Sequence, residues 1–184
     1  EIIDGMEMDL NFHRYENFKQ LQLYCYRAAS VVGLLSARIF GFTNKDTLKY
    51  AHDLGIALQL TNIIRDLGED AHRGRIYVPL DLLDQFSLTE DDILSSKRNG
   101  KLTLLVKHLG DQANDFYRSA MRRLPKEDVR KQLPGLIMGN IYYALLRKVV
   151  SKEPDNILNI STGLSPIKKI LVATTTFFGM SWIK

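Results

Sequence analysis

Cysteine and long apolar runs are scarce in this chain of 184 residues. Cys25 is the single cysteine, so no disulfide can form within the chain, and a reducing compartment is consistent with this. No window reaches the roughly 18 uninterrupted apolar residues that a membrane-spanning helix requires. The net charge is only +4, and the most basic stretch, residues 118–131, has no aromatic recognition pattern. These features argue against a disulfide-stabilised protein, a membrane-spanning protein and a nucleic-acid partner.

Several catalytic signatures are missing too. No glycine-rich phosphate loop follows a strand, and no nucleophile elbow supports Ser-His-Asp catalysis. The histidines stand at positions 13, 52, 72 and 108, which is not the spacing of a metal site. Cys25 has no evident base partner and is interpreted as a small buried apolar residue.

Helical periodicity is what the chain does contain. Apolar residues recur at intervals of three and four almost throughout, and glycine and proline mark the breaks. Helices are predicted over residues 2–12, 16–40, 44–70, 90–95, 101–123, 126–150 and 165–183. Pro134 and Gly135 interrupt one of these segments and predict a kink or a division into two helices. The prediction is an all-α protein with a single domain over residues 1–184.

Residues 59–79 contain the most informative pattern. Four oxygen-bearing side chains, which we call the polar strip, follow one another at spacings of three, four and four: Gln59, Asn62, Asp66 and Asp70. At about 100° per residue they fall within roughly 80° of one helix face, and apolar residues occupy the adjoining face. Mg²⁺ prefers carboxylate and amide oxygens and is usually shared with a phosphorylated substrate. The strip therefore predicts magnesium and diphosphate chemistry.

The arginines beside the polar strip allow two interpretations. Arg65, Arg73 and Arg75 can serve as clamps for a diphosphate. Alternatively, they neutralise the two aspartates in ordinary surface salt bridges. Gly55 lies on the same helix face and permits close approach of a ligand or of a facing helix, which favours the first interpretation.

Two other segments leave alternatives open. Tyr24 is followed by small residues at positions 28, 29, 30 and 33, which allow either tight helix packing or space for a bulky apolar ligand. The apolar tail, residues 170–183, follows Lys168 and Lys169. It is compatible with a docked C-terminal helix and equally with a segment that rests on a bilayer surface.

The order of these segments resembles that of the squalene/phytoene synthase family. Residues 59–77, with the core Asn-Ile-Ile-Arg-Asp-x-x-x-Asp, look like the family's second aspartate-rich motif. Residues 24–33 are similar to its Tyr-Cys-x-x-Val-Ala-Gly-x-Val-Gly segment, with Ala28 and Ser30 in place of a valine and a glycine. Residues 5–9 (Gly-Met-x-Met-Asp) resemble a segment shortly before it, and residues 142–146 resemble a late helix.

The resemblance implies an isoprenoid-synthase-type helical bundle around a central cavity, which joins two prenyl diphosphates head to head. Farnesyl diphosphate would give presqualene diphosphate or squalene, and geranylgeranyl diphosphate would give phytoene. In the family, Mg²⁺ ions hold the donor diphosphate while it leaves, and the second molecule's double bond attacks the allylic cation. NADPH would be needed only if the product is squalene.

The resemblance also assigns roles to residues of this chain. Asn62, Asp66 and Asp70 would be the Mg²⁺ ligands. The catalytic residues would be Tyr24, Asp66 and Asp70. The substrate-binding residues would be Gln59, Arg65 and Tyr142, and we add Arg75 from its position beside the polar strip.

One departure from the family pattern is important. The family's first aspartate-rich motif is not found in this chain, and in the family it precedes the matching segments. We therefore expect the chain to be the C-terminal portion of a domain truncated at its N-terminus, inactive by itself. The alternative is a non-catalytic helical relative that acts as an assembly or binding factor, which the intact polar strip and Tyr24 argue against. Because the substrates would be lipids, we expect a cytoplasmic protein with peripheral contact at the inner face of the membrane.

Overall fold

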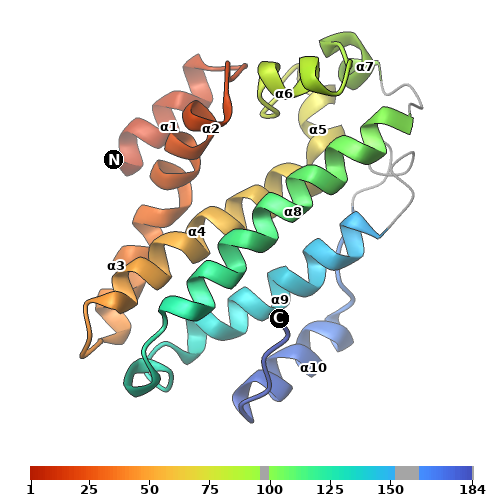
Figure 1. Cartoon of the computed structure of the whole chain (residues 1–184). Coiled ribbons are helices and arrows are strands. Elements are labelled where there is room, and N and C mark those ends of the chain that lie inside the picture. The colour runs from red at the N-terminus through yellow and green to blue at the C-terminus, as the bar shows by residue number, and fades with distance from the viewer. Residues whose placement is uncertain (96–99, 152–161, 184) are drawn as a thin grey trace.

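The computed structural model describes residues 1–95, 100–151 and 162–183, and every regular element in these ranges is helical (Figure 1). The α-helices are α1 (Ile2–Asn11), α2 (Phe18–Cys25), α3 (Val31–Phe40), α4 (Asp46–Arg65), α5 (Leu67–His72), α6 (Leu80–Gln85), α7 (Glu90–Leu94), α8 (Gly100–Arg123), α9 (Leu133–Val150) and α10 (Pro166–Phe177). A π turn, η1 (Tyr26–Ser30), joins α2 to α3, and a 3₁₀ turn, η2 (Lys126–Asp128), precedes α9. The all-α prediction is confirmed.

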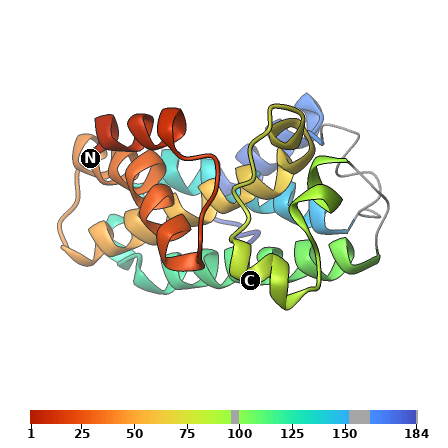
Figure 2. The same cartoon turned by 90° about the horizontal axis from the view of Figure 1, so that it is seen from above.

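Helix α4 is the central element of the structure. It packs against α8, α9, α3 and the π turn, while α10 packs on the outer side of α9 (Figure 1). Seen from above, α1–α3 lie on one side of the molecule and α5–α7 on the other (Figure 2). Side chains of α4 are accordingly buried around most of its circumference, as the consecutive buried residues 54–57 show. Beyond its first turn, where Asp46 and Lys49 are exposed, α4 therefore presents most of its side chains to neighbouring helices or to a cavity.

The crossing of α4 and the π turn depends on a glycine. A Cβ at Gly55 would lie 2.5 Å from the Cα of Ser30 and 2.8 Å from its backbone nitrogen, so no larger residue fits without displacing the backbone. The Ser30 hydroxyl also donates to the carbonyl of His52 at 2.8 Å. Gly55 thus serves the close approach of a facing helix, which was one of the two roles that the sequence left open.

Several helix boundaries differ from the predicted ones. The segment 44–70 is divided because Asp66 leaves helical geometry (φ −96°, ψ 7°), so that Asp70 lies on the separate helix α5. Pro134 stands in the first turn of α9, where its missing N–H removes no hydrogen bond, so the segment 126–150 is not kinked there but is divided before the proline into η2 and α9. The last helix ends at Phe177 rather than at residue 183, because Gly179 adopts a left-handed backbone (φ 86°) that stops it. Helix α6 was not predicted.

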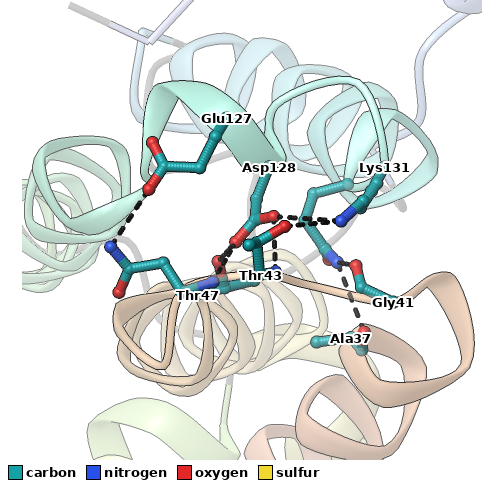
Figure 3. Close-up of polar contacts among 9 residues, drawn as sticks. Ala37, Gly41, Thr43, Thr47, Glu127, Asp128 and Lys131 are labelled. Carbon is teal, nitrogen blue, oxygen red and sulfur yellow. Dashed lines mark hydrogen bonds and ion pairs between the residues drawn. The ribbon is translucent and has the colours of Figure 1, made fainter.

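A buried carboxylate ties the turn before α9 to the start of α4 (Figure 3). Asp128 accepts hydrogen bonds from the backbone N–H groups of Thr43 (2.7 Å) and Asn44 (2.9 Å) and from the hydroxyl of Thr47 (2.7 Å). Desolvation opposes ionisation here, but these hydrogen bonds outweigh it and hold the pKa of Asp128 below its ordinary value. Nearby, Gln132 donates to the carbonyl of Gly41 at 2.9 Å. These contacts hold α9 in a defined position against α3 and α4.

The C-terminal tail is docked on α9. The side-chain oxygen of Asn140 accepts from the backbone N–H groups of Trp182 (2.8 Å) and Ile183 (3.3 Å), and its amide donates to Thr176 at 3.1 Å. Val172 is completely buried in the same contact. The docked arrangement is therefore the one observed, although the opposite face of α10 is apolar and exposed. Within the described residues, no helix combines the length and apolarity needed to cross a membrane.

Candidate active site

The four residues of the polar strip line one pocket of about 190 Å³. Its walls come from α2, α4, α5 and the segment after α5, and they consist of Tyr24, Gln59, Asn62, Ile63, Arg65, Asp66, Asp70 and Tyr77. The structure thus brings together Tyr24 and the strip, which are separated by 35 residues or more in the sequence. The break at Asp66 does not disperse the strip, because the backbone N–H of Asp70 still bonds to the carbonyl of Asp66 at 2.8 Å.

Asp66 is paired with the arginine that precedes it. The Arg65 guanidinium donates to both carboxylate oxygens, at 2.7 Å from Nε and 2.5 Å from Nη2, and both side chains are about three-quarters buried. This pairing raises the pKa of Arg65, and Tyr142 lies beside the same guanidinium. The pair corresponds to the salt-bridge interpretation of Arg65. A planar fork of this kind also matches a phosphate group, but Arg65 would hold one only in exchange for Asp66.

Asp70 and Asn62 provide further oxygen atoms to the pocket. Burial raises the pKa of Asp70 to about 6, and the neighbouring Asp66 carboxylate adds to the rise. The side-chain oxygen of Asn62 is buried and accepts no hydrogen bond from the described residues. Two crowded carboxylates and a free amide oxygen form a hard-oxygen donor set that suits Mg²⁺. The described residues contain no cluster of three or more His, Cys, Asp or Glu side chains that could hold a metal, so this set comprises two acidic ligands and one amide.

Tyr24 is held by a hydrogen-bonded network at the edge of the pocket. Its hydroxyl donates to Asp9 at 3.2 Å and accepts from the Gln59 amide at 3.4 Å, and Asn62 in turn donates to Gln59 at 3.4 Å. Burial, with Tyr77 and Asp9 adding to it, raises the pKa of Tyr24 above its ordinary value. The phenol therefore keeps its proton near neutral pH and acts as a hydrogen-bond donor.

Two residues of this network, Asp9 and Tyr77, and Tyr15, which packs against its rings, were not identified from the sequence. The hydroxyl of Tyr77 donates to the second oxygen of Asp9 at 2.8 Å. The rings of Tyr15, Tyr24 and Tyr77 lie with centroids 5.3 to 5.8 Å apart. Asp9 and Tyr77 both lie in segments that resemble the family, and this was the only available signal for them, because no spacing rule connects them with Tyr24.

The remaining candidate residues lie outside the pocket lining. Arg75 is half-buried, and its charge is close enough to lower the pKa of Asp70. Arg73 is exposed and pairs with Glu69 at 2.7 Å, as in the salt-bridge interpretation. His72 is exposed at the end of α5. Cys25 is buried in the core, in agreement with its interpretation as a small apolar residue.

A second, apolar cavity of about 450 Å³ begins where the polar strip ends. Gln59, Asn62 and Tyr142 line its entrance, and the cavity then continues between α3, α4 and α9. Small residues, including Ala28, Ala29 and Gly33, leave room for it. The small-residue cluster therefore serves both roles considered above, because a Cβ at Gly33 would also lie 2.9 Å from the carbonyl oxygen of Ala51.

A helical bundle with an acidic pocket opening into an apolar cavity is typical of an isoprenoid synthase. A profile of the squalene/phytoene synthase family matches residues 1–168, and the chain belongs to this family. It is 36% identical over 177 residues to phytoene synthase 2 of Solanum lycopersicum, covering 93% of this chain and 57% of the relative. It is also 36% identical over 176 residues to the phytoene synthase of Mycobacterium bovis, covering 94% and 58%.

Two solved structures are similar as well. A dehydrosqualene synthase in complex with ligand matches with a TM-score of 0.76 and 25% identity, over 97% of this chain and 63% of that one. The squalene synthase HpnC of Alicyclobacillus acidocaldarius matches with a TM-score of 0.70 and 27% identity, over 81% of this chain and 58% of that one. The chain thus spans little more than half the length of the relatives quoted.

Proposed function

We propose that this chain belongs to a Mg²⁺-dependent prenyltransferase that joins two prenyl diphosphates head to head. The observation that carries the proposal is the position of the oxygen donors Asn62, Asp66 and Asp70, with Tyr24, at the entrance of an apolar cavity. This arrangement suits a substrate with a doubly anionic head and a long hydrocarbon tail. The names of the relatives, phytoene synthase and squalene synthase, support the same reaction class.

Each part of the site has a function in such a reaction. Mg²⁺, when bound to the strip, would neutralise the negative charge that develops on the departing diphosphate. Arg65 would exchange Asp66 for phosphate oxygens, and the neutral Tyr24 hydroxyl would turn its proton from Asp9 to the leaving group. The apolar walls would exclude water, so that the allylic cation would react with the second prenyl chain rather than with water.

A non-catalytic assembly factor explains the site less well. The oxygen of Asn62 is buried without a partner among the described residues, which is unfavourable in a protein that uses the helix only for packing. Burial chiefly raises the pKa of Asp70, and the nearby Asp66 carboxylate raises it further. A bound cation would relieve both features.

The proposal includes peripheral contact with a membrane, because the substrates are lipids. Ile167, Ile170 and Phe177 on α10 are 80%, 66% and 64% exposed, and Lys168 and Lys169 lie beside them. Apolar side chains next to lysines favour an anionic lipid surface. Replacement of Ile170 and Phe177 by serine should reduce co-sedimentation with anionic vesicles, and unchanged co-sedimentation would contradict this part of the proposal.

The reaction is tested with the complete gene product and Mg²⁺. Farnesyl and geranylgeranyl diphosphate are supplied separately, with and without NADPH, and products are identified by mass spectrometry. Asp66→Ala should lower product formation by about 100-fold or more, whereas the matched control Glu69→Ala, which alters an exposed acidic residue paired with Arg73, should not lower it. Absence of a condensation product with either substrate, in a folded protein that binds Mg²⁺ poorly, would favour the non-catalytic alternative.

A further inference from the structure

The apolar cavity extends from the polar strip toward the base of α4 and the start of α9. Along α4 its lining residues run from Asn62 to Tyr50, and along α9 from Tyr142 to Gln132. Phe40, near the end of α3, lines the same end. Phe40, Tyr50 and Gln132 therefore form the floor of the cavity, and the strip lies at its mouth.

The floor is held rigidly. The Gln132 amide donates to the carbonyl of Gly41 at 2.9 Å, and Thr47, which is three residues before Tyr50, donates to Asp128 at 2.7 Å. Figure 3 shows this corner, in which Asp128 joins the turn before α9 to the start of α4. The base of α4 and the start of α9 are thus fixed to each other beneath the cavity.

Tyr50 is a large floor residue and is fully buried, with 1% of its surface exposed. Its hydroxyl has no hydrogen-bond partner among the described residues. The oxygen would lie 3.1 Å from a Cβ at Gly135, so the phenol reaches across to the backbone of α9 at a position that has no side chain. A buried hydroxyl without a hydrogen bond lowers stability, and here it fills the space between α4 and α9 beside Gly135.

The depth of the cavity follows from helix geometry. At 1.5 Å per residue, Tyr50 lies about 18 Å along α4 from Asn62 and about 14 Å from Gln59. An isoprenoid unit contributes four carbons to the length of the chain and spans about 5 Å, given C–C bonds of about 1.5 Å. With the diphosphate at the strip, three units reach Tyr50, and a fourth extended unit would collide with its ring.

We propose that Tyr50 limits the cavity to three isoprenoid units and thereby selects a C15 over a C20 prenyl diphosphate. The inference rests on the proposed function for its substrate class. It adds a residue that determines chain length, in a chain whose quoted sequence relatives are named phytoene synthases.

The experiment measures kcat/KM of the complete gene product for farnesyl and geranylgeranyl diphosphate. The wild type should prefer the C15 substrate, and Tyr50→Ala should shift the ratio of the two kcat/KM values toward the C20 substrate by about tenfold or more. Tyr50→Leu, whose side chain is shorter but still apolar, should shift this ratio in the same direction. It keeps the test valid if the alanine variant does not fold. Tyr50→Phe keeps the ring, so it should keep the preference for the C15 substrate. The control Tyr117→Phe alters a buried tyrosine on α8 outside the cavity and should leave the ratio unchanged.

A binding measurement separates this inference from the proposed function. Farnesol and geranylgeraniol, which lack the diphosphate, displace a fluorescent apolar probe from the wild type and from Tyr50→Leu. Tighter binding of farnesol to the wild type, reversed in the variant, would support the role of Tyr50 even if no condensation product is found. Condensation with an unchanged substrate ratio in Tyr50→Ala and Tyr50→Leu would refute the role of Tyr50 while the proposed function stands. A wild type that prefers the C20 substrate would refute it as well.

Discussion

Replacing Gly55 by alanine is expected to separate α4 from the π turn. The added Cβ would lie 2.5 Å from the Cα of Ser30 and 3.0 Å from the carbonyl carbon of Ala29. Ordinary contact begins at 3.4 Å, and backbone atoms cannot swing aside as a side chain can, so the two elements must move apart by nearly 1 Å. Because backbone atoms must move, this overpacking lies in the upper part of the usual range, at about 2–3 kcal/mol, and the better helix propensity of alanine offsets about 1 kcal/mol of it.

The expected loss is therefore about 1–2 kcal/mol of unfolding free energy. For a chain of this size each kcal/mol lowers the Tm by about 2–4 °C, so the Tm should fall by about 2–8 °C. The displacement should also break the 3.4 Å hydrogen bond between Gln59 and Tyr24, which is already long. Turnover should then fall more than stability suggests, by about 100-fold, because catalysis is sensitive to shifts of 1 Å.

The assay is urea denaturation followed by circular dichroism, together with the condensation assay on the same preparations. Gly100→Ala is the matched control, because a Cβ at Gly100 meets no atom within 4 Å. It should be neutral or stabilise the protein by up to about 1 kcal/mol. If Gly55→Ala unfolds at the same urea concentration as the wild type or at a higher one, the close crossing of α4 and the π turn is wrong.

Other substitutions test the remaining parts of the structure. Asp66→Ala should weaken Mg²⁺ binding, measured by calorimetry, and lower turnover by about 100-fold or more. The Tm should change little, because a partly exposed ion pair contributes only about 0–1 kcal/mol. Unaltered Mg²⁺ affinity would contradict the metal assignment. Asp128→Asn should lower the Tm near neutral pH. Because the folded pKa of Asp128 lies below its ordinary value of 3.8, the difference in Tm between variant and wild type should be complete above pH 3.8 and shrink as the pH falls below that value. A difference independent of pH would show that the charge of Asp128 has no role. Asn140→Ala leaves the N–H groups of Trp182 and Ile183 without their acceptor. It should lower the free energy of unfolding by about 2 kcal/mol and speed proteolysis of the tail. A tail as resistant to proteolysis as in the wild type would argue against the docking contact.

The sequence alone determined the features that depend on neighbours along the chain. Helical class follows from the spacing of apolar residues, since that spacing decides which side chains share a face. The polar strip followed in the same way, because residues three and four apart lie on one side of a helix even where the backbone breaks, as it does at Asp66. The family resemblance depended on the order of these same local patterns and could be stated without coordinates.

Only the tertiary structure decided which distant residues meet. Asp9 binds Tyr24 and Tyr77, which are 15 and 68 positions away, and no periodicity connects such residues. The floor of the cavity has the same origin. Tyr50 reads as an ordinary core residue of an amphipathic helix, and its hydroxyl faces Gly135 only because Asp128 holds α9 against α4. Spacing along a helix places a side chain on a face, but the packing of helices determines what that face meets, and this contact is what we expect to decide substrate length.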